Sequence, residues 1–139
     1  METIITKQYS LRNQPFYGLL GRVVGLVDSN SQSLSFYTKK LQEANLDVLT
    51  FSNLSELSSQ VLVVPIDVVV FSPSLDQIAQ DLRSLSSFIS QNPKLPLITM
   101  AKTMQEMQIN AIMKLGTRLH INRDLSQPRD LLVALEQII

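Results

Sequence analysis

The stretch Asp67-Val68-Val69-Val70-Phe71-Ser72 carries the strongest strand signal in the 139-residue sequence. Its successive β-branched residues favour extended backbone. Because apolar residues occupy consecutive positions, both faces of this strand must be covered, as they are in the centre of a parallel sheet. Pro65 stands before the stretch, and a helical pattern begins after it at Leu75. The sequence therefore predicts a buried parallel strand that ends at Ser72.

Four further apolar runs have the length of strands, and they lie at 23–27, 47–51, 96–100 and 118–122. Between and after them, apolar residues recur at helical spacing in 31–44, 54–61, 75–90, 103–115 and 126–138. Strands that alternate with helices in this way run parallel, with right-handed crossovers and helices on both faces of the sheet. We therefore expect an α/β domain of three layers, α/β/α, whose five-stranded parallel sheet has the flavodoxin-like order 2-1-3-4-5.

Residues 1–21 show no sustained period, so we assign them to an N-terminal extension and residues 22–139 to a single domain. The extension could be loose, could lie across the surface of the domain, or could take part in dimer contacts. Its scattered apolar residues include Ile4, Ile5, Tyr9, Phe16 and Tyr17.

Composition excludes several classes of function. Hydrophobic residues make up 45% of the chain, and 12 basic side chains balance 12 acidic ones, which argues against a nucleic-acid groove. The absence of cysteine excludes a disulfide framework, a thiolate metal site and a cysteine nucleophile. No apolar run approaches the roughly 18 residues of a membrane span, and the first residues lack the apolar core of a signal peptide. We expect a soluble, cytoplasmic domain.

In a doubly wound sheet, function is concentrated at the carboxyl ends of the strands. The residues expected there are Asp28-Ser29-Asn30, Ser52-Asn53, Ser72-Pro73-Ser74, Ala101-Lys102 and Arg123-Asp124.

In the spacing of the predicted strands and in the local sequence pattern around them, residues 22–139 resemble the receiver domain of response regulators, the CheY-like superfamily. In that family the first strand ends in paired acids, and here Asp28-Ser29 occupies that place. The third strand ends in the aspartate that accepts the phosphoryl group, where this chain has Ser72. The fourth ends in threonine or serine and the fifth in lysine, where this chain has Ala101 and Arg123. Of these motif residues only Asp28 is retained.

Each replacement removes part of the phosphotransfer chemistry that the resemblance implies. Clustered carboxylates bind Mg²⁺, but Ser29 and Ser72 leave one carboxylate. A serine hydroxyl is a weak nucleophile without a nearby base. Ala101 lacks a hydroxyl, and Arg123 keeps the charge of lysine but changes its geometry. The expected site is therefore a degenerate acceptor pocket of Asp28, Ser29, Ser72, Ala101 and Arg123, with no catalytic residue, metal or cofactor.

The resemblance then implies a pseudo-receiver, also called an atypical receiver: a regulatory protein–protein interaction module in signal transduction, not an enzyme, attached to an output domain. In receivers the face formed by helix four, strand five and helix five contacts partners or a second copy. This face places Met113, Lys114, Arg118, His120 and Arg129 as candidate contact residues. We expect no direct contact with nucleic acid or membrane.

The sequence leaves several alternatives open. Asp28 could be a residual metal ligand, or it could cap the next helix or pair with a cation. Arg123 could pair with Asp28 or be solvated. His120 lacks a hydroxyl partner at position 101, so we expect partial exposure and no phosphorylation-linked switching; a pH-sensing role is the alternative. Rival functions are a phosphoreceiver of a two-component phosphorelay with displaced acids, a flavodoxin-like binder of a small ligand at Ser29-Asn30-Ser31, and a phosphoserine switch at Ser72.

Overall fold

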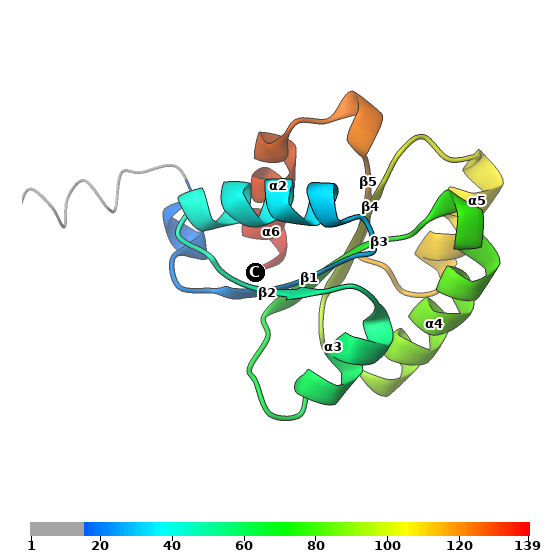
Figure 1. The fold of residues 1–139 in the computed structure, drawn as a ribbon, viewed down its shortest axis with the longest axis horizontal. Helices are drawn as coiled ribbons and strands as arrows, with labels where there is room; N and C mark the ends of the chain where they lie inside the picture. The colour runs from blue at the N-terminus through cyan, green and yellow to red at the C-terminus, as the bar shows by residue number, and fades with distance from the viewer. Residues whose placement is uncertain (1–15) are drawn as a thin grey trace, which may run out of the picture.

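The computed structural model describes residues 16–139, which form a five-stranded sheet between two layers of helices (Figure 1). All neighbouring strands pair in parallel, in the order β2-β1-β3-β4-β5. The predicted fold class and strand order are therefore confirmed. The strands are β1 (Val23–Asp28), β2 (Asp47–Phe51), β3 (Val68–Ser72), β4 (Leu97–Ala101) and β5 (Leu119–Asn122).

Five α-helices connect or follow the strands, namely α2 (Ser31–Glu43), α3 (Leu54–Gln60), α4 (Ile78–Gln91), α5 (Glu106–Lys114) and α6 (Pro128–Ile138). Three short 3-10 helices accompany them, η1 (Tyr17–Leu19), η2 (Leu75–Gln77) and η3 (Arg123–Leu125). None of the helices within 16–139 is long and apolar enough to cross a bilayer.

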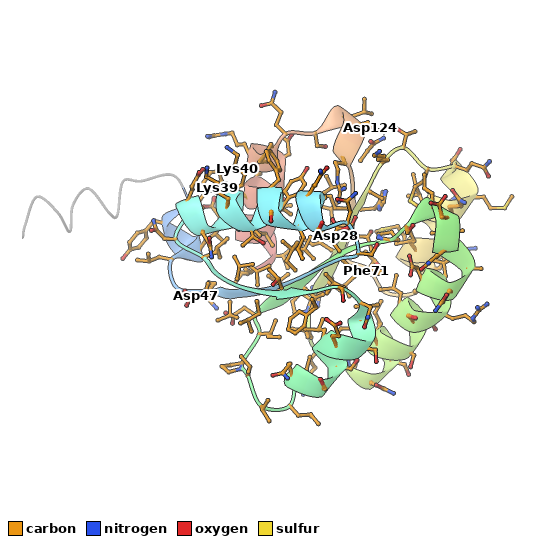
Figure 2. All side chains as sticks on the ribbon, viewed as in Figure 1. Asp28, Lys39, Lys40, Asp47, Phe71 and Asp124 are labelled. Carbon is orange, nitrogen blue, oxygen red and sulfur yellow. The ribbon has the colours of Figure 1, made fainter. Side chains whose placement is uncertain are left out.

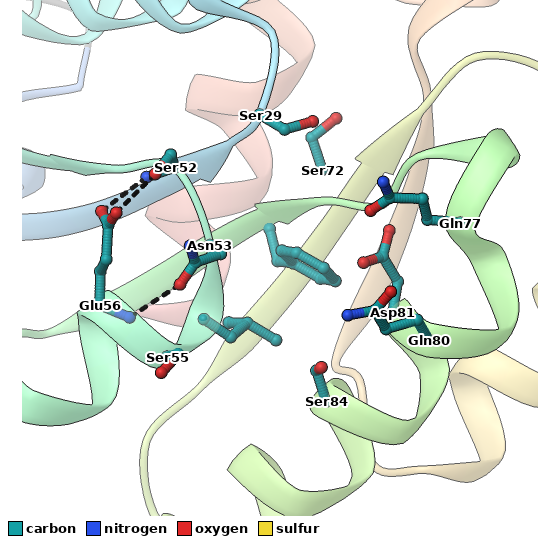
Figure 3. A pocket seen from close by; sticks show the side chains of 12 residues that line it. Ser29, Ser52, Asn53, Ser55, Glu56, Ser72, Gln77, Gln80, Asp81 and Ser84 are labelled. Atoms are coloured by element: carbon teal, nitrogen blue, oxygen red, sulfur yellow. Dashed lines mark hydrogen bonds between the residues drawn. The ribbon is translucent and has the colours of Figure 1, made fainter.

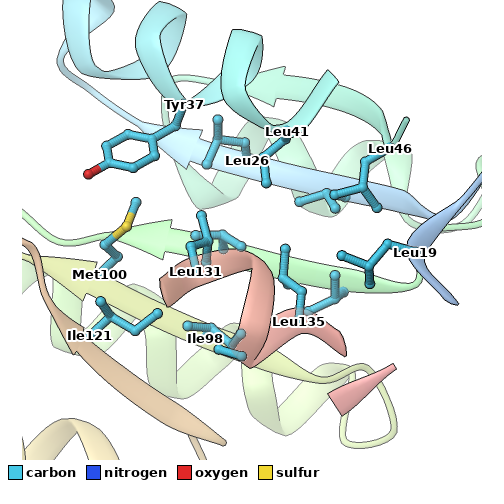
Figure 4. Packing of buried hydrophobic residues seen from close by; sticks show 14 residues of the cluster. Leu19, Leu26, Tyr37, Leu41, Leu46, Ile98, Met100, Ile121, Leu131 and Leu135 are labelled. Carbon is cyan, nitrogen blue, oxygen red and sulfur yellow. The ribbon is translucent and has the colours of Figure 1, made fainter. Parts of the chain in front are cut away.

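Alternate residues of the central strand β3 build the two halves of the core. Val68 and Val70 pack beneath α2 and α6, in a cluster that also contains Leu26, Tyr37 and Leu135 (Figure 4). On the opposite face, β3 contributes Val69 and Phe71 to a second cluster, which lies under α3, α4 and α5. Every residue of β3 is buried, because helices cover the strand on both sides, as its continuous apolar run predicts.

The strand register brings the polar ends of β1 and β3 together. Asp28 pairs in register with Ser72, so the last residues of both strands stand side by side at the carboxyl edge of the sheet. At the same edge, Ala101 of β4 pairs with Asn122 of β5. In Figure 2, Asp28 and Phe71 lie at this edge, whereas Asp47 lies at the opposite end of the sheet.

Several helix starts differ from the predicted ones, and α4, for example, begins at Ile78 and not at Leu75. Asn30, and not Ser29 or Ser31, caps α2, and its side-chain oxygen accepts hydrogen bonds from the backbone N–H groups of Gln32 and Ser33 at 3.0 Å each. The helix predicted from residue 103 begins at Glu106, because Thr103 is hydrogen-bonded to another loop instead.

The described end of the N-terminal extension packs against the domain. Leu19 of η1 is fully buried and belongs to the cluster beneath α2 and α6. Phe16 packs against the same cluster, and the guanidinium carbon of Arg129 lies 5.3 Å from the centre of its ring. Ile4, Ile5 and Tyr9 lie outside the described residues.

Candidate functional site

The site at the carboxyl edge of the sheet is organised by the guanidinium of Arg123. Its Nη2 donates to the Ser72 hydroxyl at 2.6 Å and lies 3.4 Å from Oδ2 of Asp28. Asp28 and Ser72 are only 6% and 8% exposed, and the Arg123 side chain is 18% exposed. Of the two alternatives that the sequence left open for Arg123, pairing with Asp28 is the one that the structure shows, and the pair lies in a largely dehydrated environment.

Arg123 crosses the sheet edge to reach these partners. It begins η3 directly after β5, and its Nη2 also lies 3.5 Å from the carbonyl oxygen of Met100 in β4. Its guanidinium carbon stands 5.3 Å from the centre of the Tyr37 ring, within cation–π distance. The buried Nε has no hydrogen-bond partner among the described residues. One guanidinium thus links the ends of β5, β4, β3 and β1 and packs beneath α2.

Asp28 has a second structural role besides the ion pair. Its Oδ1 accepts a hydrogen bond from the backbone N–H of Asn30 at 2.9 Å, which fixes the turn that leads into α2. Both carboxylate oxygens are therefore engaged by the protein itself. Within 16–139, no group of three or more histidine, cysteine or acidic residues could hold a metal ion.

Four of the five residues predicted for the degenerate pocket line one cavity. Asp28, Ser29, Ser72 and Arg123 border a space of about 320 Å³ at the carboxyl edge. Ala101 does not. It is buried and packs in the cluster beneath α3, α4 and α5. Its prediction as a pocket residue is wrong, because its methyl group is part of the core.

Two further residues border this cavity: Lys102, which was expected at a strand end but not assigned to the pocket, and Asp76, which sequence reasoning did not place there. The resulting charge set is mixed: Asp28 and Asp76 oppose Lys102 and Arg123. Lys102 had been placed at a strand end, so its neighbourhood was predictable. Asp76 borders the cavity from η2, the 3-10 turn that follows β3. The helical pattern in the sequence did not indicate this turn.

A second polar link closes the loop between β4 and α5. Oδ2 of Asp124 accepts hydrogen bonds from the backbone N–H and the hydroxyl of Thr103, at 2.7 and 2.9 Å. These bonds hold the pKa of Asp124 below its usual range. The Asn122 side chain donates to the same Thr103 hydroxyl at 3.2 Å. The loop after β4 is therefore tied to the turn after β5.

Only some of the residues predicted for the interaction face lie on one surface. Met113 and Lys114 at the end of α5 are exposed, as is Arg118 just before β5. Arg129 lies elsewhere: besides stacking on Phe16, it borders a groove with Lys40 and Glu43 of α2. Arg129 is therefore not part of a surface shared with α5. Leu119, which sequence reasoning did not select, is exposed on β5 beside Arg118.

His120 has a hydroxyl partner that the sequence did not reveal. Its Nδ1 lies 2.8 Å from Oγ1 of Thr99, and Thr99 is fully buried. The two residues are opposite each other in the β4–β5 register, two positions before Ala101. The expected partial exposure of His120 is confirmed, and its hydroxyl partner is Thr99 and not a residue at position 101.

We expect the free energy of unfolding to depend on pH through His120. Burial lowers the pKa of His120 in the folded protein, so the unfolded chain binds a proton more readily. The free energy of unfolding is therefore highest above the ordinary histidine pKa of about 6.5. It decreases as the pH falls from there to the lower pKa of the folded protein. Urea unfolding between pH 5 and 8 measures this slope.

The control for this slope is His120→Gln, whose amide oxygen can still accept a hydrogen bond from Thr99. Acidic residues titrate in both proteins, so the informative quantity is the difference between their stabilities at each pH. This difference is expected to change with pH between 5 and 7. A constant difference would contradict the assigned direction of the histidine shift.

Comparisons with known proteins agree on the fold. No family model matches the sequence, and the search of curated proteins gives no significant match. A response regulator from Thermotoga maritima superposes with a TM-score of 0.75 at 18% identity, covering 86% of this chain and 98% of its own. The chemotaxis protein CheY4 of Vibrio cholerae gives 0.75 at 15% identity, with 86% and 99% covered.

A third similar structure is a CheY-like protein, tadZ, from Pseudomonas aeruginosa PAO1. Its TM-score is 0.74 at 16% identity, with 86% of this chain and 100% of that chain covered. At these identities the likeness concerns the backbone, and it extends over nearly the whole length of each similar chain. The chain therefore has the CheY-like fold of response-regulator receiver domains.

Proposed function

We propose that this chain is a pseudo-receiver, a regulatory interaction module that works without aspartate phosphorylation. One observation carries the proposal. Arg123 donates to Ser72 and pairs with Asp28, so a built-in cation lies among the groups that correspond to the receiver's acceptor and metal ligands. A receiver-like signalling role then depends on a permanent arrangement of the site and not on a transferred phosphoryl group.

The chemistry of the replaced groups supports this proposal. Phosphoryl transfer to a receiver needs a carboxylate nucleophile and a divalent cation that offsets the charge on the phosphoryl oxygens. Ser72 offers a hydroxyl that, within residues 16–139, has no histidine or carboxylate among its hydrogen-bond partners. Asp28 offers one carboxylate, already paired, and Mg²⁺ prefers several oxygen ligands in octahedral geometry. The hydroxyl of Ser72 and the paired carboxylate of Asp28 therefore support a site that works without phosphoryl transfer.

The link from Asp124 to Thr103 favours a single conformation of the site. A receiver that responds to phosphorylation needs two arrangements of this edge that differ in free energy by a small amount. Here the loop after β4 is bound by the side chain of Asp124, and Arg123, directly after β5, is bound to Asp28 at the end of β1. We infer that the module docks its partner constitutively.

For the docking surface, we propose the exposed part of the α5–β5 face, formed by Met113, Lys114, Arg118 and Leu119. It joins two exposed apolar side chains with two basic ones, a combination that fits a protein segment carrying apolar and acidic residues. A second copy of this chain is the other candidate partner.

The test exposes the wild-type chain to acetyl phosphate, and separately to beryllofluoride, each with Mg²⁺. Intact mass is expected to stay unchanged, and the amide NMR spectrum is expected to show no Mg²⁺-dependent shifts at Asp28 or Ser72. Sedimentation velocity is expected to give the same oligomeric state with and without acetyl phosphate. A stoichiometric phosphoryl adduct would contradict the proposal and favour a phosphoreceiver with displaced acids.

A further inference from the structure

A second cavity, larger than the one at Arg123, opens between α3 and α4 at the carboxyl ends of β1 to β3 (Figure 3). Its volume is about 570 Å³. Of its twelve lining residues only Leu54 and Phe71 are apolar, and five are serines. This lining is unusual for a ligand pocket, which is mostly apolar with a few polar groups. The cavity therefore offers an occupant several hydrogen-bonding groups beside its apolar surface.

The charges on this lining are all negative. Glu56 and Asp81 are its ionisable residues, and no lysine, arginine or histidine borders it. Glu56 is already engaged, because its carboxylate accepts the backbone N–H and the hydroxyl of Ser52 at 3.0 and 2.6 Å. Asp81 is thus the carboxylate that remains available to an occupant.

Asp81 is partly buried and has no counter-ion among residues 16–139. Its Oδ2 accepts the backbone N–H of Ser74 at 2.7 Å, whereas Oδ1 accepts no hydrogen bond from the described residues. The ion pairs found within 16–139 involve other carboxylates. Burial raises the pKa of Asp81, and the Ser74 hydrogen bond only partly opposes this rise. The Asp81 carboxylate is therefore partly dehydrated, and no cation among residues 16–139 compensates for its charge.

Neighbouring side chains add hydrogen-bond acceptors around this carboxylate. Figure 3 shows the carboxylate of Asp81 between the amides of Gln77 and Gln80, with the Ser84 hydroxyl on the same side of the cavity. Three carbonyl-type groups and a hydroxyl can accept several N–H bonds at once. A guanidinium carries five N–H donors in one plane, whereas an ammonium is a compact charge with three.

We propose that this cavity is a receptor for an arginine side chain of a protein partner, with Asp81 as its counter-ion and Gln77 and Gln80 as further acceptors. This inference goes beyond the proposed function, because it concerns a surface between α3 and α4 and not the α5–β5 face. The cavity shares Ser29 and Ser72 with the smaller one. A bound arginine therefore lies next to the position of the missing phosphoryl acceptor.

The probe for this site is N-acetyl-arginine-N-methylamide, titrated into the complete ¹⁵N-labelled chain. Amide shifts are expected at Ser74, Gln77, Gln80 and Asp81, with saturation. Asp81→Asn, which can still accept the Ser74 hydrogen bond, is expected to weaken binding about tenfold or more, since it removes a charge-assisted partner. Asp47→Asn, an exposed position at the opposite end of the sheet, is the matched control and is expected to bind normally.

A second variant tests the same cavity without removing Asp81. Ser84→Arg lies three residues later on α4 and supplies an internal cation, so it is expected to abolish binding of the probe. The corresponding citrulline compound, which has the shape of arginine without its charge, is expected to cause no saturable shift. The proposal is overturned if the arginine compound leaves these amides unshifted, if citrulline binds equally well, or if Mg²⁺ saturates the site while arginine does not.

Discussion

Arg123→Ala is expected to lower the free energy of unfolding by about 3 kcal/mol, because breaking a buried ion pair leaves the other charge without a partner. Asp28 is 6% exposed, so its carboxylate cannot regain full hydration when the guanidinium is removed. Ser72 loses its hydrogen bond at the same time, and the Tyr37 ring loses a packing partner. Urea unfolding at pH 7 measures the loss.

A double-mutant cycle separates the ion pair from the packing of Arg123. Asp28→Asn removes the charge but keeps an acceptor for the Asn30 backbone N–H. We expect Arg123→Ala to cost less in the Asp28→Asn background, with a coupling energy of about 1–3 kcal/mol, as is typical of contacting charged residues. Additive effects within about 0.5 kcal/mol would mean that the pair contributes nothing to stability.

The fold could be predicted from the sequence because its decisive signals are local. In β3, five consecutive buried positions require cover on both faces, and an alternating order of strands and helices supplies this cover only as a doubly wound sheet. Helix boundaries were harder. The start of α5 shifts to Glu106 because Asp124, more than twenty residues away, binds Thr103 and keeps residues 103–105 out of the helix.

The candidate site could be predicted in part, since strand ends meet at one edge of a parallel sheet. That rule places Arg123 at the same edge as Asp28, but it leaves open whether the two side chains pair, because an arginine side chain is long enough either to cross the ends of β4 and β3 or to extend into solvent. The burial of Ala101, the partner of His120 and the cavity around Asp81 depend on side-chain directions and on the packing of α3 against α4. Patterns along the sequence carry no such information.

Restoring the acidic groups is expected to restore metal-dependent chemistry, provided that Arg123 is replaced as well. Ser72→Asp alone is expected to fail. The guanidinium donates to the Ser72 hydroxyl at 2.6 Å, so it would form an ion pair with the new carboxylate and keep Mg²⁺ away. The triple variant Ser29→Asp, Ser72→Asp and Arg123→Lys instead provides three carboxylates and a single ammonium donor.

The register supports the placement of these carboxylates, since residue 72 stands beside Asp28 and residue 29 follows directly. Ala101 is left unchanged in this variant, because a threonine there would bring a hydroxyl into the core cluster under α3, α4 and α5. Isothermal titration with Mg²⁺, and then with beryllofluoride in its presence, is expected to show saturable binding to the triple variant and none to wild type or to Ser72→Asp. Binding by Ser72→Asp equal to that of the triple variant would show that Arg123 does not block the metal site, and with it the central premise of a permanently occupied pocket would fail.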